Sequence, residues 1–277
     1  MNHELKLEDY IKLKNLIYDK AGLFFATNKI YFVKKRLEKR MTALALNDFQ
    51  AYYDRLKYFD RNGEELQSLI NELTTNETYF FREPFQLEVF ADHCLAEVMA
   101  AGHNAEKNLR IWSAGCSSGE EPYTLAIIMQ EKLRIHPAWC FSIMATDIDT
   151  VILKRAEEGL YNDRSIKNVK PELLKRYFNF TPEGYRISQN LKNMVSFSHL
   201  NLNDGTKMKA VRGLDFLFCR NVLIYFDELS RKIAMAHFYD SLNRGGFIFL
   251  GHSESVTRIN SAFSLKRLGG MIVYQKP

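Results

Sequence analysis

Paired cysteines and histidine clusters are absent from this 277-residue sequence. Its four cysteines are scattered and include no CxxC pair, and no histidine group has metal-ligand spacing. They are Cys94, Cys116, Cys140 and Cys219. This pattern argues against a zinc site or a disulfide framework and indicates a reducing compartment. We therefore expect no metal.

Long apolar runs and low-complexity stretches are also absent. No uncharged apolar run approaches the roughly 18 residues that a membrane-spanning helix needs. The start of the chain, through Tyr10, is polar and acidic, unlike the basic and then apolar pattern of a secretory signal. Six prolines and 46% hydrophobic residues indicate a folded core. The sequence thus predicts a cytoplasmic protein with no segment inserted in a membrane.

The charge balance is mildly basic, with a formal net charge of +5 and a pI near 8.9. An excess of this size suits an acidic partner, either a nucleic acid or an acidic protein surface. An ordinary enzyme without a charged partner can carry the same charge. Composition alone does not choose among these.

Residues 1–82 are predicted to form an all-helical N-terminal domain. Apolar residues at spacings of three and four form one helical stripe: Ile30, Val33, Leu37, Met41 and Leu44. On the opposite face of this helix the sequence places Lys35, Arg36 and Lys39. Two further helices are expected, over 48–58 and 63–73.

Residues 83–277 are predicted to form a doubly wound, Rossmann-like α/β domain, because the apolar period changes near Leu109. Strands are expected over 109–114, 140–149, 215–219, 245–251 and 271–275, alternating with helices over 120–133, 150–161 and 227–242. Residues 162–200 interrupt this alternation. There, a helix over 170–178 and strands over 185–188 and 194–200 suggest a small antiparallel β-subdomain inserted in the sheet.

The segment GCSSGEEPY follows the first predicted strand, where an open α/β sheet binds its ligands. Gly115 and Gly119 permit a tight turn, but their spacing fails the dinucleotide fingerprint. Glu120 and Glu121 would repel a pyrophosphate and would suit ribose hydroxyls or an ammonium group. S-adenosylmethionine carries those groups and no phosphate. The alternative is that both acids only complement the helix dipole.

Two more strand ends carry polar residues. Asp147 ends the second predicted strand, where an acid commonly accepts hydrogen bonds from ribose hydroxyls. The alternative is a helix N-cap, a role that suits Asp149 better. After the DFLF strand, the amide of Asn221 suits an amino-acid group or an adenine edge, or it only closes the loop. Tyr225 follows one turn later. A D/N-P-P-Y motif is missing here, which disfavours methylation of amide or adenine nitrogens.

Five segments, NETYFFRE, IWSAGCSSGEEPYTLAI, ATDID, FCRNVLIYF and FLGHSES, resemble those of the CheR chemoreceptor methyltransferases in order and spacing. The resemblance covers the chain from about residue 10 onward. It implies a class I methyltransferase sheet and methyl transfer from S-adenosylmethionine to receptor glutamates, with S-adenosylhomocysteine as the product. The cofactor contacts it implies are Asn76, Thr78, Arg82, Glu121, Asp147, Asn201, Leu202, Asn221 and Val222. We expect Arg82 and Tyr225 to orient the incoming carboxylate, and Cys116 to be a core residue.

The resemblance also suggests the partner. Family receptors present their methylation sites on long cytoplasmic helices with acidic surroundings, which the Lys35, Arg36 and Lys39 face could dock; the alternative is a merely solvated face. Some members grip a receptor's C-terminal tether by strand addition. The short NFTPEGYRI connection here favours a tether-independent enzyme.

Two other functions remain open from the sequence. The first is methylation of RNA or a small molecule, although a basic surface with interleaved aromatics is not evident and no nucleic-acid partner is expected. The second is a non-catalytic module that senses S-adenosylmethionine.

Overall fold

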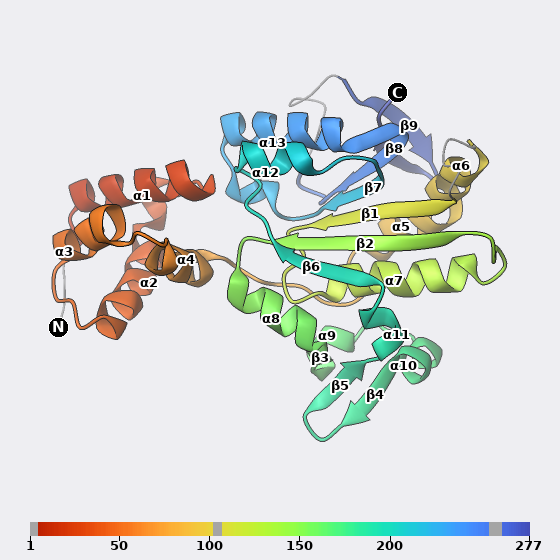
Figure 1. The fold of residues 1–277 in the computed structure, drawn as a ribbon, viewed down its shortest axis with the longest axis horizontal. Helices are drawn as coiled ribbons and strands as arrows, with labels where there is room; N and C mark the ends of the chain where they lie inside the picture. The colour runs from red at the N-terminus through yellow and green to blue at the C-terminus, as the bar shows by residue number, and fades with distance from the viewer. Residues whose placement is uncertain (1–4, 102–106, 255–261) are drawn as a thin grey trace.

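The computed structural model describes residues 5–101, 107–254 and 262–277. The first four residues of the predicted helical domain and Ser255 of the FLGHSES segment lie outside this part of the chain. Figure 1 shows a helical domain at one end, a larger α/β body, and a small lobe that carries β4 and β5.

The N-terminal region is helical, as the sequence predicts. Its elements are α1 (Leu7–Ala21), the 3₁₀ turn η1 (Thr27–Lys29), α2 (Ile30–Ala43), α3 (Phe49–Asp54), the π-helical turn η2 (Arg55–Phe59) and α4 (Glu64–Leu73). The predicted stripe of α2 faces the core, where Val33, Leu37 and Met41 are at most 1% exposed. Helix α1 ends at Gly22, whose left-handed φ of 71° permits a C-cap.

The α/β body is built on a seven-stranded sheet in the order β6-β2-β1-β7-β8-β10-β9. The strands are β1 (Asn108–Ala114), β2 (Cys140–Asp147), β6 (Val195–His199), β7 (Leu214–Cys219), β8 (Leu242–Leu250), β9 (Ser264–Leu268) and β10 (Met271–Gln275). All pairs run parallel except those that β10 makes with β8 and β9. The chain winds from β1 to one side and then returns to the other at β7. This reversal is a topological switch point, where such sheets bind ligands.

Helices cover both faces of the sheet, which confirms the doubly wound fold. They are α5 (Pro84–Val89), the π-helical turn η3 (Phe90–Cys94), α6 (Leu95–Ala100), α7 (Glu120–Leu133), α8 (Thr150–Glu158), α12 (Gly205–Ala210) and α13 (Glu228–Ser241). Alternate residues of β1 belong to separate cores: Ile111 packs with Phe90 and α7, whereas Trp112 packs with Phe238 of α13. Burial on both faces explains the nearly continuous apolar composition of the central strands.

The inserted subdomain differs from the prediction. Its small antiparallel sheet has the order β3-β5-β4, formed by Leu160–Tyr161, Gly184–Ile187 and Phe178–Thr181, and it carries α9 (Asp163–Ile166), α10 (Pro171–Tyr177) and α11 (Gln189–Lys192). The predicted strand over 194–200 is instead β6 of the main sheet. It pairs in parallel with β2, from Ile143↔Val195 to Asp147↔His199. The assignment was wrong because β6 covers an edge of β2 that local sequence patterns do not reveal.

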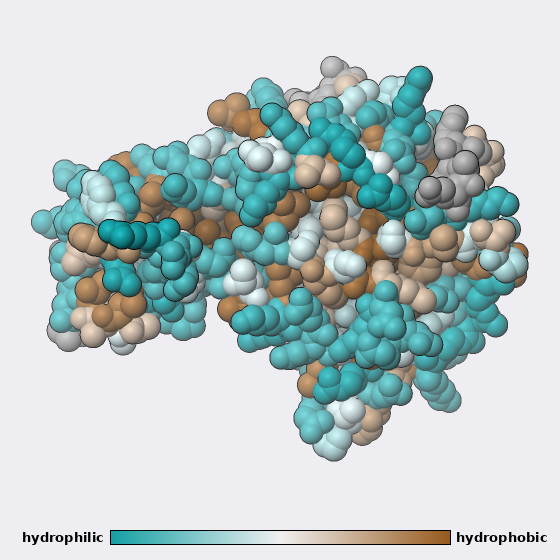
Figure 2. All heavy atoms as spheres, in the orientation of Figure 1, coloured by the Kyte–Doolittle hydropathy of each residue, from teal (hydrophilic) through white to brown (hydrophobic). Residues whose placement is uncertain are grey.

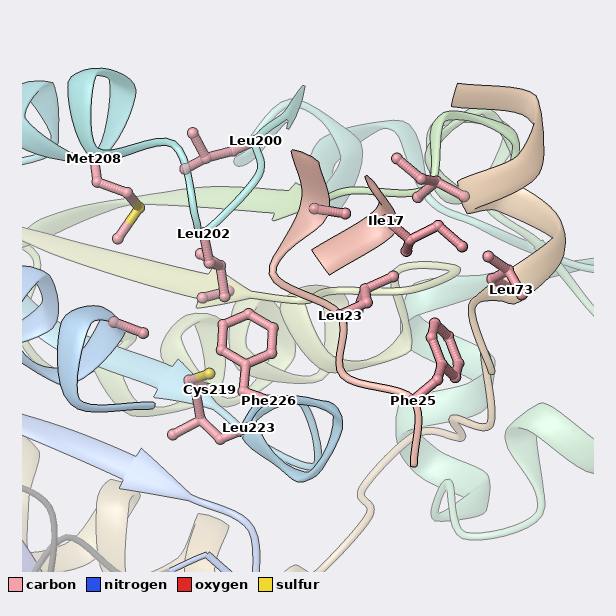
Figure 3. Packing of buried hydrophobic residues seen from close by; sticks show 14 of the residues in the cluster. Ile17, Leu23, Phe25, Leu73, Leu200, Leu202, Met208, Cys219, Leu223 and Phe226 are labelled. Carbon is pink, nitrogen blue, oxygen red and sulfur yellow. The ribbon is translucent and has the colours of Figure 1, made fainter. Parts of the chain in front are cut away.

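The helical domain packs directly against the carboxyl edge of the sheet. In Figure 3, Leu23 of the segment after α1 lies toward Leu202 and Phe226 of the α/β body, and all three belong to one hydrophobic core. Hydrogen bonds support this packing: Phe24 N–H donates to the Tyr225 carbonyl over 2.9 Å, and Asn201 Nδ2 donates to the Lys20 carbonyl over 2.7 Å. In space-filling view the outline is concave between this domain and the β4–β5 lobe (Figure 2). The end of α1 and the segment that follows it therefore cover part of the carboxyl edge of the sheet.

Candidate active site

A cavity of about 240 Å³ lies at the switch point, between the helical domain and the carboxyl ends of the strands. All nine residues predicted to contact a cofactor line it: Asn76, Thr78, Arg82, Glu121, Asp147, Asn201, Leu202, Asn221 and Val222. Tyr225 lines it too. The fold therefore brings together side chains from five separate segments. Lys35, Arg36 and Lys39 are not among the lining residues.

The turn after β1 forms the floor of the cavity. Gly115 has a left-handed φ of 82°, and a Cβ there would lie 2.3 Å from Cγ2 of Val222. Only glycine permits both the backbone conformation and the close approach of the Asn221–Val222 segment. Ser117, also left-handed at φ 49°, donates its backbone N–H to Asp147 Oδ2 over 2.8 Å. The turn is thereby tied to the end of β2.

Asp147 and Asp149 divide two roles between them. Asp149 caps α8, accepting from the N–H groups of Val151 and Ile152, which confirms the expected N-cap. Asp147 is 8% exposed and faces the cavity, and its Oδ1 accepts from the Asp149 N–H over 2.9 Å. Burial raises the pKa of Asp147 to about 6, against the lowering effect of these backbone donors. Its carboxylate is thus held in place and still borders the ligand space.

The adjacent acids Glu120 and Glu121 point to different surroundings. Glu120 accepts from the hydroxyls of Ser118 and Ser165 and does not line the cavity. Glu121 lines it, accepting from Ser113 Oγ over 2.7 Å. Successive residues of a helix lie about 100° apart, so only the second acid of α7 reaches the site.

Arg220 is a site residue that the sequence reasoning missed. Its side chain is 3% exposed and lies 3.2 Å from both Glu121 and Glu83. It also donates to the Arg82 carbonyl. Burial raises the pKa of Glu121, and the Arg220 guanidinium acts against this rise. An arginine directly before Asn221, at the end of the largely apolar DFLFC strand, was the available signal, because a buried cation needs buried acids.

Three buried polar atoms of residues that line the cavity have no hydrogen-bond partner within the described chain. They are Asn221 Oδ1, Ser117 Oγ and Arg220 Nε. Asn221 has a left-handed φ of 60°, so its amide is presented from a strained backbone. An amide oxygen accepts from N–H or O–H groups. The acceptor oxygens of Asn221 and Ser117 thus fit a ligand carrying an ammonium, an exocyclic amine or hydroxyls, as S-adenosylmethionine does.

The connection between α4 and α5 supplies the opposite wall. Asn76 Nδ2 donates to Asp149 Oδ2 over 2.8 Å, and Arg82 Nη1 donates to the Glu77 carbonyl over 2.8 Å. The guanidinium of Arg82 also lies 5.9 Å from the centre of the Tyr79 ring. Arg82 is therefore half-buried at the edge of the cavity and remains free of carboxylate partners within the described residues.

Strained backbone concentrates around this site. Among the described non-glycine residues, six have positive φ, and three of these line the cavity or pair with Arg220: Glu83, Ser117 and Asn221. Each such conformation costs about 1–3 kcal/mol, and persists only where its surroundings impose it. Such clustering is typical of functional sites.

The basic face of α2 lies away from the cavity and is partly engaged within the domain. Arg36 stacks 3.4 Å from the Phe32 ring centre and donates to the Glu72 carbonyl. Lys39 forms an ion pair of 2.6 Å with Glu72. Lys35 is exposed. Of the three predicted docking residues, only Lys35 therefore makes no contact with Glu72 in the part of the chain that the structure describes.

Comparisons with known proteins agree with this geometry. A family described as "CheR methyltransferase, all-alpha domain" matches residues 8–74, and "CheR methyltransferase, SAM binding domain" matches residues 76–269. "Chemotaxis protein methyltransferase 2" of Vibrio cholerae is 42% identical over 270 residues, spanning 97% of this chain and 93% of that protein. "Chemotaxis protein methyltransferase" of Escherichia coli is 37% identical over 282 residues, spanning 99% and 93%. The matches divide at residues 74–76, and the boundary predicted at residue 82 stays a prediction. With its helical domain, its methyltransferase sheet and its S-adenosylmethionine site in this order, the chain belongs to the CheR methyltransferase family.

Proposed function

We propose that the protein transfers the methyl group of S-adenosylmethionine to glutamate side chains on the cytoplasmic helices of chemoreceptors. The products are glutamyl methyl esters and S-adenosylhomocysteine. The observation that carries this proposal is the cavity in which Asn221 Oδ1 and Ser117 Oγ have no described partner, beside Asp147 and Glu121. The chemotaxis methyltransferases among its relatives support the choice of acceptor.

The chain's own residues have a positioning task. S-adenosylmethionine supplies, when bound, an electrophilic methyl group on a sulfonium. A glutamate acceptor is ionised at neutral pH, with an ordinary pKa of about 4.3, and needs no strong general base. Arg82 and Tyr225 border the cavity from opposite segments and orient the acceptor carboxylate. Alignment of this kind accounts for up to roughly 7–11 kcal/mol of a barrier.

A covalent thiol route is disfavoured by the surroundings of Cys116. Its side chain is 1% exposed, and burial raises its pKa well above the usual range. The negative charges of Asp147 and Glu121 raise it further. A thiolate is the reactive form of cysteine, so Cys116 acts as a core residue of the turn and not as a nucleophile.

The acceptor helix docks, on this account, against the helical domain. Lys35 and Lys39 are exposed on α2, and an acidic helix would compete with Glu72 for Lys39. Exposed charges attract over about 8–10 Å at physiological salt. The same domain roofs the active site through Phe24 and Lys20, so a helix held there is presented near the cavity.

Receptor binding is proposed to be independent of a tether. The NFTPEGYRI connection is a β4–β5 hairpin, in which Thr181 pairs with Gly184 and only Pro182 and Glu183 intervene. A two-residue turn offers little backbone beyond the two strands with which a tether could pair. The short connection is the feature on which the tether-independent proposal rests. No nucleic acid and no membrane insertion are part of the proposal; no described helix is both long and apolar enough to span a bilayer.

Transfer of radiolabelled methyl groups tests this function. Purified protein is incubated with labelled S-adenosylmethionine and either chemoreceptor signalling domains or RNA, and the label is then exposed to alkali. We expect alkali-labile label on receptor alone. Label on RNA would establish a different acceptor, and cofactor binding with no label on any receptor would support a sensor.

A further inference from the structure

Glu254, the acid of the GHSES segment, accepts three backbone hydrogen bonds in the turn after β8. Its Oε2 accepts from the N–H groups of Gly251 at 2.8 Å and Asn221 at 2.9 Å, and its Oε1 accepts from Ile224 at 3.2 Å. Its own N–H donates to the Gly251 carbonyl over 2.9 Å. One carboxylate thus joins two chain segments more than 25 residues apart.

The segment it joins to needs such a partner. Asn221 is left-handed, and the 3₁₀ turn η4 (Leu223–Tyr225) begins two residues later. The first N–H groups of a helical turn have no partner within it, and no side chain of η4's own N-cap residue bonds to them. Glu254 therefore caps this turn from a distant part of the chain.

Close packing leaves this arrangement little freedom. A Cβ at Gly251 would lie 2.8 Å from the Asn221 nitrogen and 2.9 Å from Glu254 Oε2. Only a glycine lets the two backbones approach so closely. The turn after β8, the carboxylate and the Asn221 backbone consequently form one rigid unit behind the cavity.

We propose that Glu254 is a positioning residue, which holds the Asn221–Tyr225 turn in the geometry that binds the cofactor and presents Tyr225. Glu254 is not among the residues that line the cavity, so it contacts neither the cofactor nor the acceptor carboxylate directly. Its action on Asn221 concerns cofactor binding alone. Its action on Tyr225 rests on the proposed function, in which Tyr225 orients the acceptor.

Binding of S-adenosylhomocysteine by the full chain, followed by calorimetry, tests the first action. Glu254→Ala removes all three acceptor bonds and should weaken binding by about tenfold or more, as expected for lost bonds to a charged group. Glu254→Gln has nearly the same shape but turns an N–H toward a backbone N–H, and should give a smaller loss. Ser253→Ala, an exposed residue of the same turn, is the matched control. Unchanged affinity in both Glu254 variants would overturn the proposal.

Double-mutant cycles separate positioning from loss of stability. If Glu254 acts through Asn221, Glu254→Gln should weaken S-adenosylhomocysteine binding less in an Asn221→Ala background than in the wild type. Equal fold-losses in both backgrounds would overturn the inference. The same cycle with Tyr225→Phe, in which kcat is measured, tests the second action. If Tyr225→Phe alone leaves kcat unchanged, the proposed role of Tyr225 is contradicted. If Tyr225→Phe and Glu254→Gln each lower kcat and their effects are additive, the role of Glu254 is contradicted. Glu254→Gln keeps this test available if Glu254→Ala does not fold.

Discussion

Asn76 donates a 2.8 Å hydrogen bond to the same Asp149 carboxylate that caps α8. Thr74 Oγ1 also donates to Asp149, over 2.7 Å, and both bonds end on Oδ2, whereas Oδ1 caps the helix. The connection from the helical domain is thereby fixed to the helix that follows β2. One buried acid sets both the start of a helix and one wall of the cavity.

Asp149→Ala should therefore lower both stability and cofactor affinity. Loss of an N-cap costs about 1–2 kcal/mol in the free energy of unfolding, and Asn76 loses its acceptor. Urea unfolding and S-adenosylhomocysteine binding measure the two effects. Asp48→Ala, which removes the cap of α3 away from the cavity, is the control and should lower stability alone. Full cofactor affinity in Asp149→Ala would show that this acid does not shape the site.

Gly115→Ala should abolish cofactor binding. The new Cβ would lie 2.3 Å from Val222 Cγ2 at a φ of 82°, so the floor of the cavity has to shift. Gly63→Ala is a matched control, because its φ is 70° but nothing lies within 4 Å of the added Cβ. It should cost only about 1–2 kcal/mol of stability for the left-handed conformation. Equal S-adenosylhomocysteine affinity in the two variants would contradict the close approach seen here.

As the pH rises, titration of Asp147 should lower the free energy of unfolding but raise the affinity for S-adenosylhomocysteine. Its folded-state pKa, about 6, is above the ordinary 3.8, so the folded state binds the proton more readily. This carboxyl therefore stabilises the fold fully below about pH 4, and its contribution is lost as the pH rises through about 6. Ligand hydroxyls prefer the ionised carboxylate, so affinity for S-adenosylhomocysteine should rise over the same range.

Asp147→Asn is the corresponding test, because it removes the titration while keeping the shape. Its affinity and its free energy of unfolding should both depend less on pH between 4 and 7 than those of the wild type. Identical pH profiles in the two proteins would exclude Asp147 as the group responsible.

Arg82→Ala should lower the single-turnover rate of methyl transfer at saturating cofactor and acceptor. The guanidinium orients the acceptor carboxylate, and its present contacts are a backbone carbonyl and the Tyr79 ring. Arg164→Ala offers a control, since this exposed arginine belongs to the neighbouring α9 and does not line the cavity. A normal rate in Arg82→Ala would remove it from the orienting role and leave a cofactor contact possible.

Charge reversal at Lys35 and Lys39 should raise KM for the receptor and leave kcat unchanged. Both are exposed on α2, and neither lines the cavity. Reversal at Lys12, an exposed cation of α1 paired with Asp9, is the control. Rising salt should weaken receptor binding in the wild type more than in the double variant. A KM insensitive to both the substitutions and salt would place docking elsewhere.

Much of the architecture could be predicted because local periodicity records it. In the α2 stripe, Val33, Leu37 and Met41 are buried and Ile30 and Leu44 are partly buried, and the apolar runs of the central strands are buried as expected. The place of β6 could not be predicted, because its pairing with β2 joins segments separated by α8 and the whole inserted subdomain. Strand periodicity identifies a strand but not its neighbour.

Residues that line the cavity could be predicted from the sequence, but the contacts that hold them in place could not. The family motifs identify Asn76, Asp147 and Asn221, which line one cavity. They do not reveal that Arg220 joins Glu121 and Glu83 at the cavity wall, or that Glu254 holds the Asn221 turn. Such contacts depend on long-range packing and on strained backbone, which leave no periodic trace in sequence.

Locating the transferred methyl group tests the central claim most directly. Receptor signalling domains treated with the enzyme and S-adenosylmethionine are digested, and tandem mass spectrometry maps the modified side chain, with an Asn221→Ala enzyme as the control. We predict one added methyl group on glutamate carboxyls, absent when those glutamates are replaced by alanine and greatly reduced with Asn221→Ala. Methylation of nitrogen or sulfur side chains, or equal modification by the Asn221→Ala enzyme, would contradict the account.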